Sequence, residues 1–124
     1  MNFHTIVRPE HLNQYHFLFG GVMLKWVDEY AYIAATTEFP GAHFVTRAMD
    51  QVEFTQSVSN GDLLRFHVTR SHTGATSAQY LVQVFARPLH QTDEHPVFRT
   101  AVTMVAVGDD GRKTPLPPPI LAAP

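Results

Sequence analysis

The chain has 124 residues, of which 44% are hydrophobic, so it is long enough for one domain with a modest core and too short for two. Nine Lys and Arg against eleven Asp and Glu give a formal charge of −2, so the overall charge does not indicate a nucleic-acid or membrane-surface partner. The absence of cysteine excludes disulfides, thiolate metal ligands and thiolate nucleophiles.

The first segment, MNFHTIVRPE, has neither a basic leader nor a long apolar run. Because the chain also lacks an apolar window of about 18 residues, we expect neither export nor a membrane span, and hence a cytoplasmic protein. Residues 2–8 predict a short edge strand, which Pro9 ends because proline lacks the N–H that a strand ladder needs. A polar loop, PEHLNQYH, follows.

Residues 20–38 predict one helix of about five turns, ended by Phe-Pro-Gly at 39–41. Helical spacing predicts a narrow polar stripe of Gly21, Lys25, Asp28, Glu29, Tyr32 and Thr36. It predicts an opposite, buried side of Met23, Trp26, Val27, Tyr30, Ile33 and Ala34. A mostly buried helix in so short a chain indicates that the remaining residues wrap around it.

After the helix the apolar period changes from helical to two, which is typical of strands. Four segments follow this pattern: HFVTRAMDQVEFT, LLRFHVTR, AQYLVQVFAR and VFRTAVTMVAV. Their connections are short, so the sheet should be antiparallel, and the fold class should be α+β with five strands around one helix. We expect one domain over residues 1–113. Residues 114–124, which hold five of the nine prolines, should form an extended or disordered tail.

Four short motifs follow one another along these elements, and their order and spacing resemble the acyl-CoA thioesterase branch of the hotdog-fold superfamily. The first comprises Asn13, Leu18, Phe19, Gly20 and Gly21, followed by Trp26 and Asp28 in the helix. The second comprises Val45, Thr46, Asp50, Val52 and Phe54, the third Val58, Gly61 and Asp62, and the fourth Gly74, Thr76 and Ser77. The resemblance extends from about residue 2 to residue 107.

This resemblance implies a hotdog fold, in which a five-stranded sheet wraps a central helix and two copies join their sheets. It implies at least a homodimer, with a tetramer or hexamer as the expected assembly, and active sites at the subunit interface. The implied substrate is an acyl-CoA thioester. Coenzyme A is then part of the substrate, and no separate cofactor, nucleic acid or membrane partner is expected.

Thioester hydrolysis needs an attacking group and stabilisation of the developing oxyanion. Asp28 is the candidate general base or nucleophile, and the sequence leaves both roles open. Gly20 and Gly21 fall where the first helical turn has free N–H groups, so they are the candidate oxyanion site. Asn13 and Thr46 are candidates for positioning the thioester or water, and in relatives these positions meet the Asp of the other subunit.

Coenzyme A contacts are expected from the turn with Gly74, Thr76 and Ser77, as the resemblance implies. We also expect His16 and Phe19 to contact substrate. His16 replaces a small residue found in many relatives, which could alter the pocket entrance. Three arginines are possible phosphate partners, and the sequence does not choose among them: Arg65, Arg70 and Arg87.

Other interpretations remain open at this point. A non-catalytic acyl-CoA-binding module would keep the pocket without turnover. A His-based dehydratase of the same fold would need His16 with Glu29, and Asp28 argues against it. No metal site is predicted, because the eight histidines lack a spacing typical of zinc ligands. Asp28 and Glu29 could also be ordinary surface or ion-paired helix residues.

Overall fold

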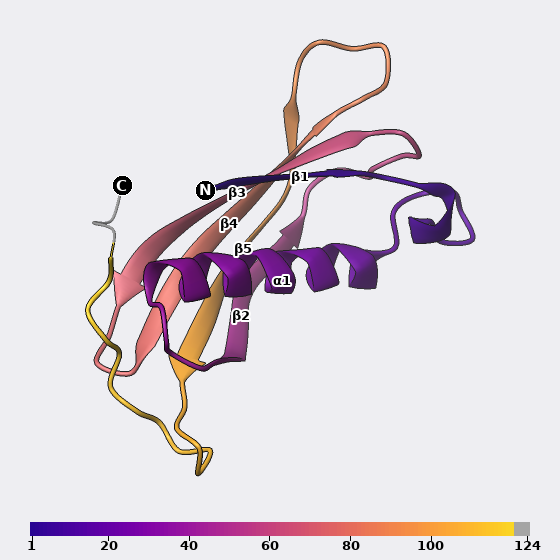
Figure 1. Ribbon diagram of the computed structural model, residues 1–124. Coiled ribbons are helices and arrows are strands. Elements are labelled where there is room, and N and C mark those ends of the chain that lie inside the picture. Colours follow the sequence, from indigo (N-terminus) through magenta and orange to yellow (C-terminus); the bar gives the residue numbers. More distant parts are fainter. Residues whose placement is uncertain (121–124) are drawn as a thin grey trace.

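Five antiparallel strands form one sheet against a single long helix in residues 1–120, the part described by the structure, a computed structural model (Figure 1). The elements are β1 (Asn2–Ile6), a 3-10 turn (Pro9–His11), α1 (Gly20–Glu38), β2 (Phe44–Phe54), β3 (Leu63–Thr73), β4 (Ser77–Arg87) and β5 (His95–Ala106). The strand order is β1-β3-β4-β5-β2, so β1 and β2 are the two edges. The predicted fold class is confirmed, and α1 has the predicted bounds.

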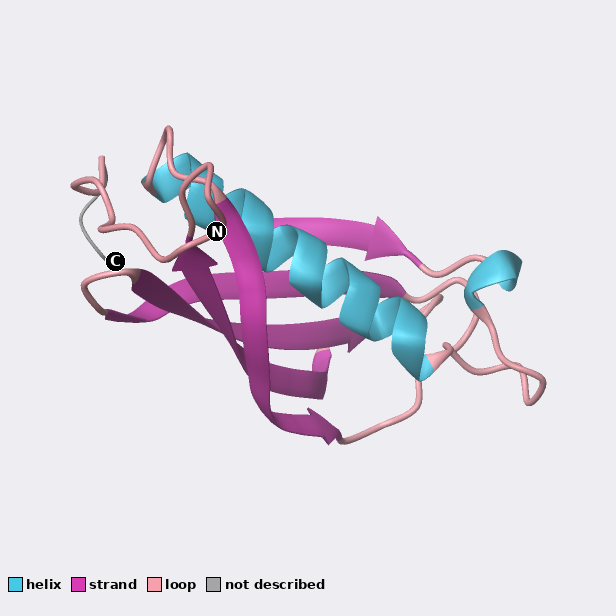
Figure 2. Ribbon diagram, turned by 90° about the horizontal axis from the view of Figure 1, so that it is seen from below, coloured by secondary structure: helices cyan, strands magenta, loops and turns pink. Residues whose placement is uncertain are grey.

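Helix α1 lies across one face of the curved sheet (Figure 2). Its buried stripe consists of Met23, Val27, Ala31, Ala34, Ala35 and Glu38. The three alanines allow the sheet to approach closely, and the strands supply larger side chains such as Phe66 and Val82. The prediction that Ile33 is buried was wrong: its side chain is 42% exposed, because it lies about 100° around the helix from Ala34.

Strand β2 departs from the simple alternation that the sequence predicts. Its register with β5 is irregular between Thr46 and Ala48 and again between Asp50 and Glu53. Such bulges shift which side chains face the core, because a slip of one residue exchanges the two faces. Val52 and Phe54, which the simple alternation places on the same face as buried Phe44, are consequently exposed. Val45, which lies before the first bulge, is also exposed. In β3, by contrast, the alternation holds, with Leu64, Phe66 and Val68 buried.

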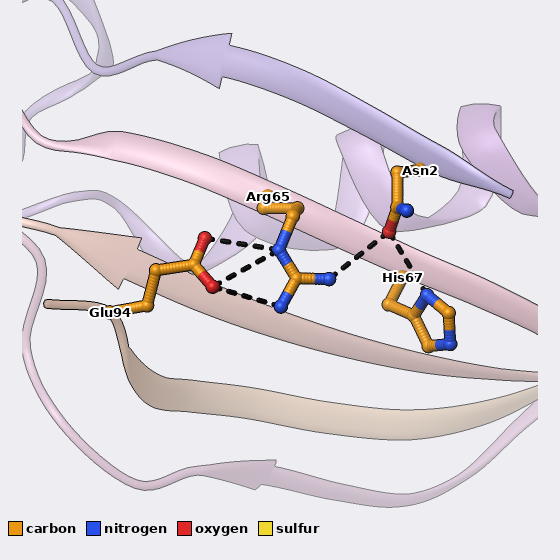
Figure 3. A network of polar contacts seen from close by, with 4 residues as sticks. All are labelled: Asn2, Arg65, His67 and Glu94. Atoms are coloured by element: carbon orange, nitrogen blue, oxygen red, sulfur yellow. Dashed lines mark hydrogen bonds and ion pairs between the residues drawn. The ribbon is translucent and has the colours of Figure 1, made fainter.

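The outer face of the sheet carries a polar network around Arg65 (Figure 3). The guanidinium donates three hydrogen bonds of 2.9–3.1 Å to Glu94 and one of 3.1 Å to Asn2. The Asn2 oxygen also lies 3.0 Å from Nδ1 of His67, and Arg65 stacks over Phe85. These contacts attach β1 and the loop before β5 to β3.

The proline-rich segment, over its described part 114–120, has no helix or strand but folds back on the domain. Backbone N–H groups of Thr114, Leu116 and Ile120 donate to the carbonyls of Ala106, Ala75 and Glu38. Leu116 packs on the core. The prediction that the tail is extended or disordered stays a prediction, and residues 121–124 lie outside the described part.

Candidate active site

Asp28 lies halfway along α1, half-buried, and faces β2. The Thr46 hydroxyl donates a hydrogen bond of 2.5 Å to Oδ1 of Asp28 and also approaches Met104 Sδ at 3.5 Å. Among residues 1–120 no basic side chain forms an ion pair with Asp28. The resemblance implies that Thr46 meets the Asp of another subunit. In this structure Thr46 instead contacts Asp28 of its own chain, because β2 passes beside α1.

The first turn of α1 leaves donors without acceptors. Phe19 occupies the N-cap position without a capping side-chain hydrogen bond, and the first turn contains no acidic residue. The N–H groups of Val22 and Met23 bond to the Phe19 carbonyl, whereas those of Gly20 and Gly21 have no acceptor within the described residues. These two N–H groups point out of the positive end of the helix, which favours an oxyanion.

Both glycines are in close contact with aromatic rings. A Cβ on Gly21 would lie 3.0 Å from the Phe19 ring, and one on Gly20 would lie 3.4 Å from the Phe54 ring. A larger residue at Gly21 would therefore displace Phe19 and cover the free N–H. Phe19 itself is 53% exposed, so its ring stands at the surface beside the helix start.

Asn13 organises the turn that precedes the helix. Its Oδ1 accepts hydrogen bonds from the N–H groups of Tyr15 at 2.9 Å and Phe17 at 3.1 Å. The amide oxygen is therefore engaged, and the amide NH₂ is left as a donor. A pocket of about 390 Å³ opens here, lined by Asn13, Phe17, Leu18, Met23 and residues 54–58. Asn13 is thus both a turn residue and part of a pocket wall.

His16 occupies a left-handed backbone conformation in the same turn, with φ of 67°. Glycine adopts this conformation without the steric cost that a Cβ brings, so His16 occupies a position that favours glycine. The His16 side chain is exposed and does not line the 390 Å³ pocket.

The predicted coenzyme A turn lies at the opposite end of the domain. The Gly74 N–H donates to the Ser77 carbonyl at 2.8 Å, and the Thr76 carbonyl accepts from Ala106. This turn joins β3 to β4 near the C-terminal end of α1 (Figure 1). Within one chain, then, Gly74, Thr76 and Ser77 are not brought together with Asn13.

The three candidate arginines are engaged in contacts of their own. Arg65 binds Glu94, and Arg87 donates to the Gln91 carbonyl at 3.1 Å. Arg70 is buried, with its guanidinium 3.8 Å from Glu38. None of these contacts points to a phosphate site.

The residues that could act on a thioester are also separated along the helix. Asp28 follows Gly21 by seven residues, which corresponds to about 10 Å at 1.5 Å per residue. Their contacts also differ, since Asp28 is bound by Thr46 and Gly21 faces the Phe19 ring. Within one chain, the described contacts therefore do not join the candidate base to the candidate oxyanion site.

A buried polar cluster at the C-terminal end of α1 was missed by the sequence analysis. Tyr80 donates a 2.6 Å hydrogen bond to Oε1 of Glu38, which is 8% exposed. Arg70 approaches the same oxygen and stacks over Phe39. Burial and the neighbouring carboxylate raise the pKa of Tyr80 well above its ordinary value. No spacing rule joins these residues, since they meet only through the packing of α1 on β3 and β4.

Comparison with known proteins now places the chain in a family. A family model described as the thioesterase superfamily matches residues 15–92. The chain belongs to the thioesterase superfamily. The resemblance drawn from the motifs is confirmed, and the matched residues include α1 and the Asp28–Thr46 pair, whereas Asn13 lies just before them.

Three relatives illustrate the likeness. Protein VdlD of Helicobacter pylori is 29% identical over 112 residues, which cover 90% of this chain and 63% of that protein. The acyl-CoA hydrolase of Staphylococcus aureus is 28% identical with a TM-score of 0.86 over 95% of this chain and 71% of that one. Cj0915 of Campylobacter jejuni, a hexameric hotdog-fold thioesterase, is 30% identical with a TM-score of 0.84, and the match covers 93% of this chain and 88% of that one. The chain thus spans less than two thirds of the length of VdlD.

Two negative observations concern the described residues alone. Residues 1–120 contain no group of three His, Asp or Glu side chains arranged to hold a metal ion. In the same range no helix combines the length and the hydrophobicity needed to cross a membrane.

Proposed function

We propose that this protein hydrolyses acyl-CoA thioesters at a site shared between two copies of the chain. The observation that carries the proposal is the pairing of Asp28 with Thr46 in a chain whose helix N-terminus leaves the N–H groups of Gly20 and Gly21 free. The Staphylococcus aureus neighbour, an acyl-CoA hydrolase in complex with butyryl coenzyme A and coenzyme A, supports the substrate class.

Variants of that neighbour support the choice of residues. Its structures include alanine substitutions of an aspartate, a threonine and an asparagine. Its asparagine and aspartate are separated by the same number of residues as Asn13 and Asp28. Its threonine lies one residue closer to the aspartate in sequence than Thr46 lies to Asp28. We therefore assign Asn13, Asp28 and Thr46 to the same site.

In the general-base form of the reaction, Asp28 takes a proton from water as the water oxygen adds to the thioester carbonyl. Negative charge develops on the carbonyl oxygen, where the N–H groups of Gly20 and Gly21 and the Asn13 amide stabilise it. The C–S bond then breaks, and the thiolate of coenzyme A leaves and takes up a proton. Thr46 holds one carboxylate oxygen and leaves the other for the water.

In the nucleophilic form, the Asp28 carboxylate itself adds to the carbonyl, displaces the thiolate and forms an anhydride, which water hydrolyses. The same groups stabilise the oxyanion in this form. The roles of Gly20, Gly21 and Asn13 are thus independent of which form operates.

The separation of about 10 Å between the backbone positions of Asp28 and Gly21 along one helix supports a shared site. A second copy can bring its own helix start to Asp28 if the two chains pair along β2. That edge exposes Val45, Val52 and Phe54, and α1 exposes Tyr32 and Ile33, a large apolar area for a single chain. Pairing of two β2 edges would cover it and give a dimer, from which a hexamer could be built.

A panel of short, long and aromatic acyl-CoAs, followed with a thiol-reactive dye, tests the proposal. The protein has no cysteine and adds no thiol background. We expect Asp28→Asn to lower turnover by about 10²- to 10⁴-fold while leaving the fold intact. Asp109→Asn, on an exposed loop, is the matched control and should keep full activity. Tight acyl-CoA binding without turnover in the wild type would instead indicate a non-catalytic binding module.

A further inference from the structure

A second pocket, of about 500 Å³, lies beside the edge strand β1 and the start of α1. Its walls are formed by Thr5, Ile6, Trp26 and Leu63 together with His4, Arg8 and His11. Every ionisable residue of this lining is basic, in a chain whose formal charge is −2. The pocket takes no part in the proposed hydrolysis, since neither Asp28 nor the glycines line it.

A hydrogen bond joins two residues of this lining, Arg8 and His11. The backbone N–H of Arg8 donates to Nδ1 of His11 at 2.9 Å, so the neutral imidazole carries its proton on Nε2 and remains a donor. The His11 ring packs edge-on against Trp26 at 4.8 Å, which fixes its position. The His11 imidazole is thus held at one side of the pocket, beside the exposed side chain of Arg8.

The carboxylates around the pocket do not cancel this charge. Among residues 1–120, no carboxylate lies within ion-pair distance of Arg8. Glu94 interacts electrostatically with His4, but its charge is already compensated by three hydrogen bonds from Arg65 (Figure 3). Glu10 follows Arg8 closely in sequence, is exposed and does not line the pocket. The pocket therefore presents one cationic side chain, Arg8, and the imidazoles of His4 and His11 to an anion.

We propose that this pocket binds the phosphate group of a nucleotide. A guanidinium matches phosphate oxygens in two parallel hydrogen bonds, and an imidazole Nε2–H adds a third donor. The volume exceeds what a lone phosphate needs, and Trp26 provides an aromatic wall for the base. The nucleotide is either that of coenzyme A or a separate one, and both share this chemistry.

Trp26 is the only tryptophan of the chain, so its fluorescence reports directly on the pocket. We would titrate ADP, and inorganic phosphate as the minimal probe, at low ionic strength, where exposed charges are least screened. Wild type and the control Arg112→Gln should show a saturable change with ADP. Arg8→Gln should bind at least about 10-fold more weakly, as expected for a lost charged hydrogen bond. No saturable change, or an unchanged Kd in Arg8→Gln, would overturn the proposal.

The source of the nucleotide is distinguished by comparing acyl-CoA with acyl-pantetheine, which lacks the nucleotide. If coenzyme A supplies it, Arg8→Gln raises KM for acyl-CoA about 10-fold and leaves KM for acyl-pantetheine unchanged. If a separate nucleotide binds, both KM values stay unchanged while ADP binding is lost. An equal rise for both substrates would contradict a phosphate site. The fluorescence titration needs no turnover, so it stands even if the proposed hydrolysis fails.

Discussion

The two ends of α1 are treated in opposite ways. At the N-terminal end, the N–H groups of Gly20 and Gly21 have no acceptor among residues 1–120, and the first turn has neither a capping side chain nor an acidic residue. At the C-terminal end, the Ile120 N–H satisfies the Glu38 carbonyl, and the Glu38 side chain is bound by Tyr80 and lies close to Arg70. One end is open to a ligand, and the other is closed by the protein itself.

This difference shows how one helix can combine function and stability. Free donors cost stability unless a solvent molecule or ligand accepts from them, so they remain where a reaction can use them. At the closed end the buried Glu38 carboxylate accepts from Tyr80 and lies close to Arg70, and these contacts anchor α1 to β3 and β4. Changes at the closed end should therefore alter unfolding, and changes at the open end should alter turnover.

The largest effect on stability is expected at the closed end. Glu38→Ala should lower the free energy of unfolding by about 3–5 kcal/mol, because it leaves the buried Arg70 without its carboxylate. Tyr80→Phe, which removes one hydrogen bond and keeps the ring, should cost only about 1–2 kcal/mol with kcat unchanged. Urea denaturation of both variants measures this. If Glu38→Ala lowers the free energy of unfolding no more than Tyr80→Phe does, the result would contradict a charged cluster.

At the open end, Gly21→Val should lower kcat about 10-fold or more, because the new side chain meets the Phe19 ring and covers the free N–H. Stability should change by less than about 1 kcal/mol, since valine is not a poorer helix former than glycine. Steady-state kinetics and denaturation on the same sample separate the two effects. Full activity in this variant would remove the helix start from the oxyanion site.

His16→Gly should raise the free energy of unfolding by about 1 kcal/mol, since glycine adopts a φ of 67° without the clash of a Cβ. His16→Ala serves as the control, because it keeps the Cβ and should give no gain. If the acyl-chain profile of His16→Gly equals that of wild type, the expected role of His16 at the pocket entrance is withdrawn.

The smallest effect concerns Glu94 on the outer face. Hydrogen bonds from Arg65, and then its charge, lower the pKa of Glu94 below the ordinary value of 4.5. A lowered pKa in the folded state contributes stability above the unfolded value, and that contribution is lost as pH falls through the folded value. Since both side chains are partly exposed, it should be less than about 1 kcal/mol. Unfolding followed below pH 5 should show it in wild type and not in Glu94→Gln.

Much of the fold could be predicted from the sequence because periodicity and turn residues act locally. The bounds of α1 and the alternation in β3 are examples. Features that depend on tertiary packing could not be predicted: the bulges that reverse faces in β2, and the meeting of Glu38 with Tyr80. The candidate site residues rest on motif resemblance. That Asp28 contacts Thr46 of the same chain follows only from the path of β2.

The central claim, that one site takes Asp28 from one chain and Asn13 from another, is tested most directly by mixing two inactive variants. Asp28→Asn and Asn13→Ala are each expected to be nearly inactive alone. After unfolding and refolding together, half of the dimers are mixed, and each mixed dimer holds one intact site of its two. The account predicts recovery to about a quarter of the wild-type rate. No recovery, with mixed dimers present, would contradict a shared site and place both residues in one chain's own site.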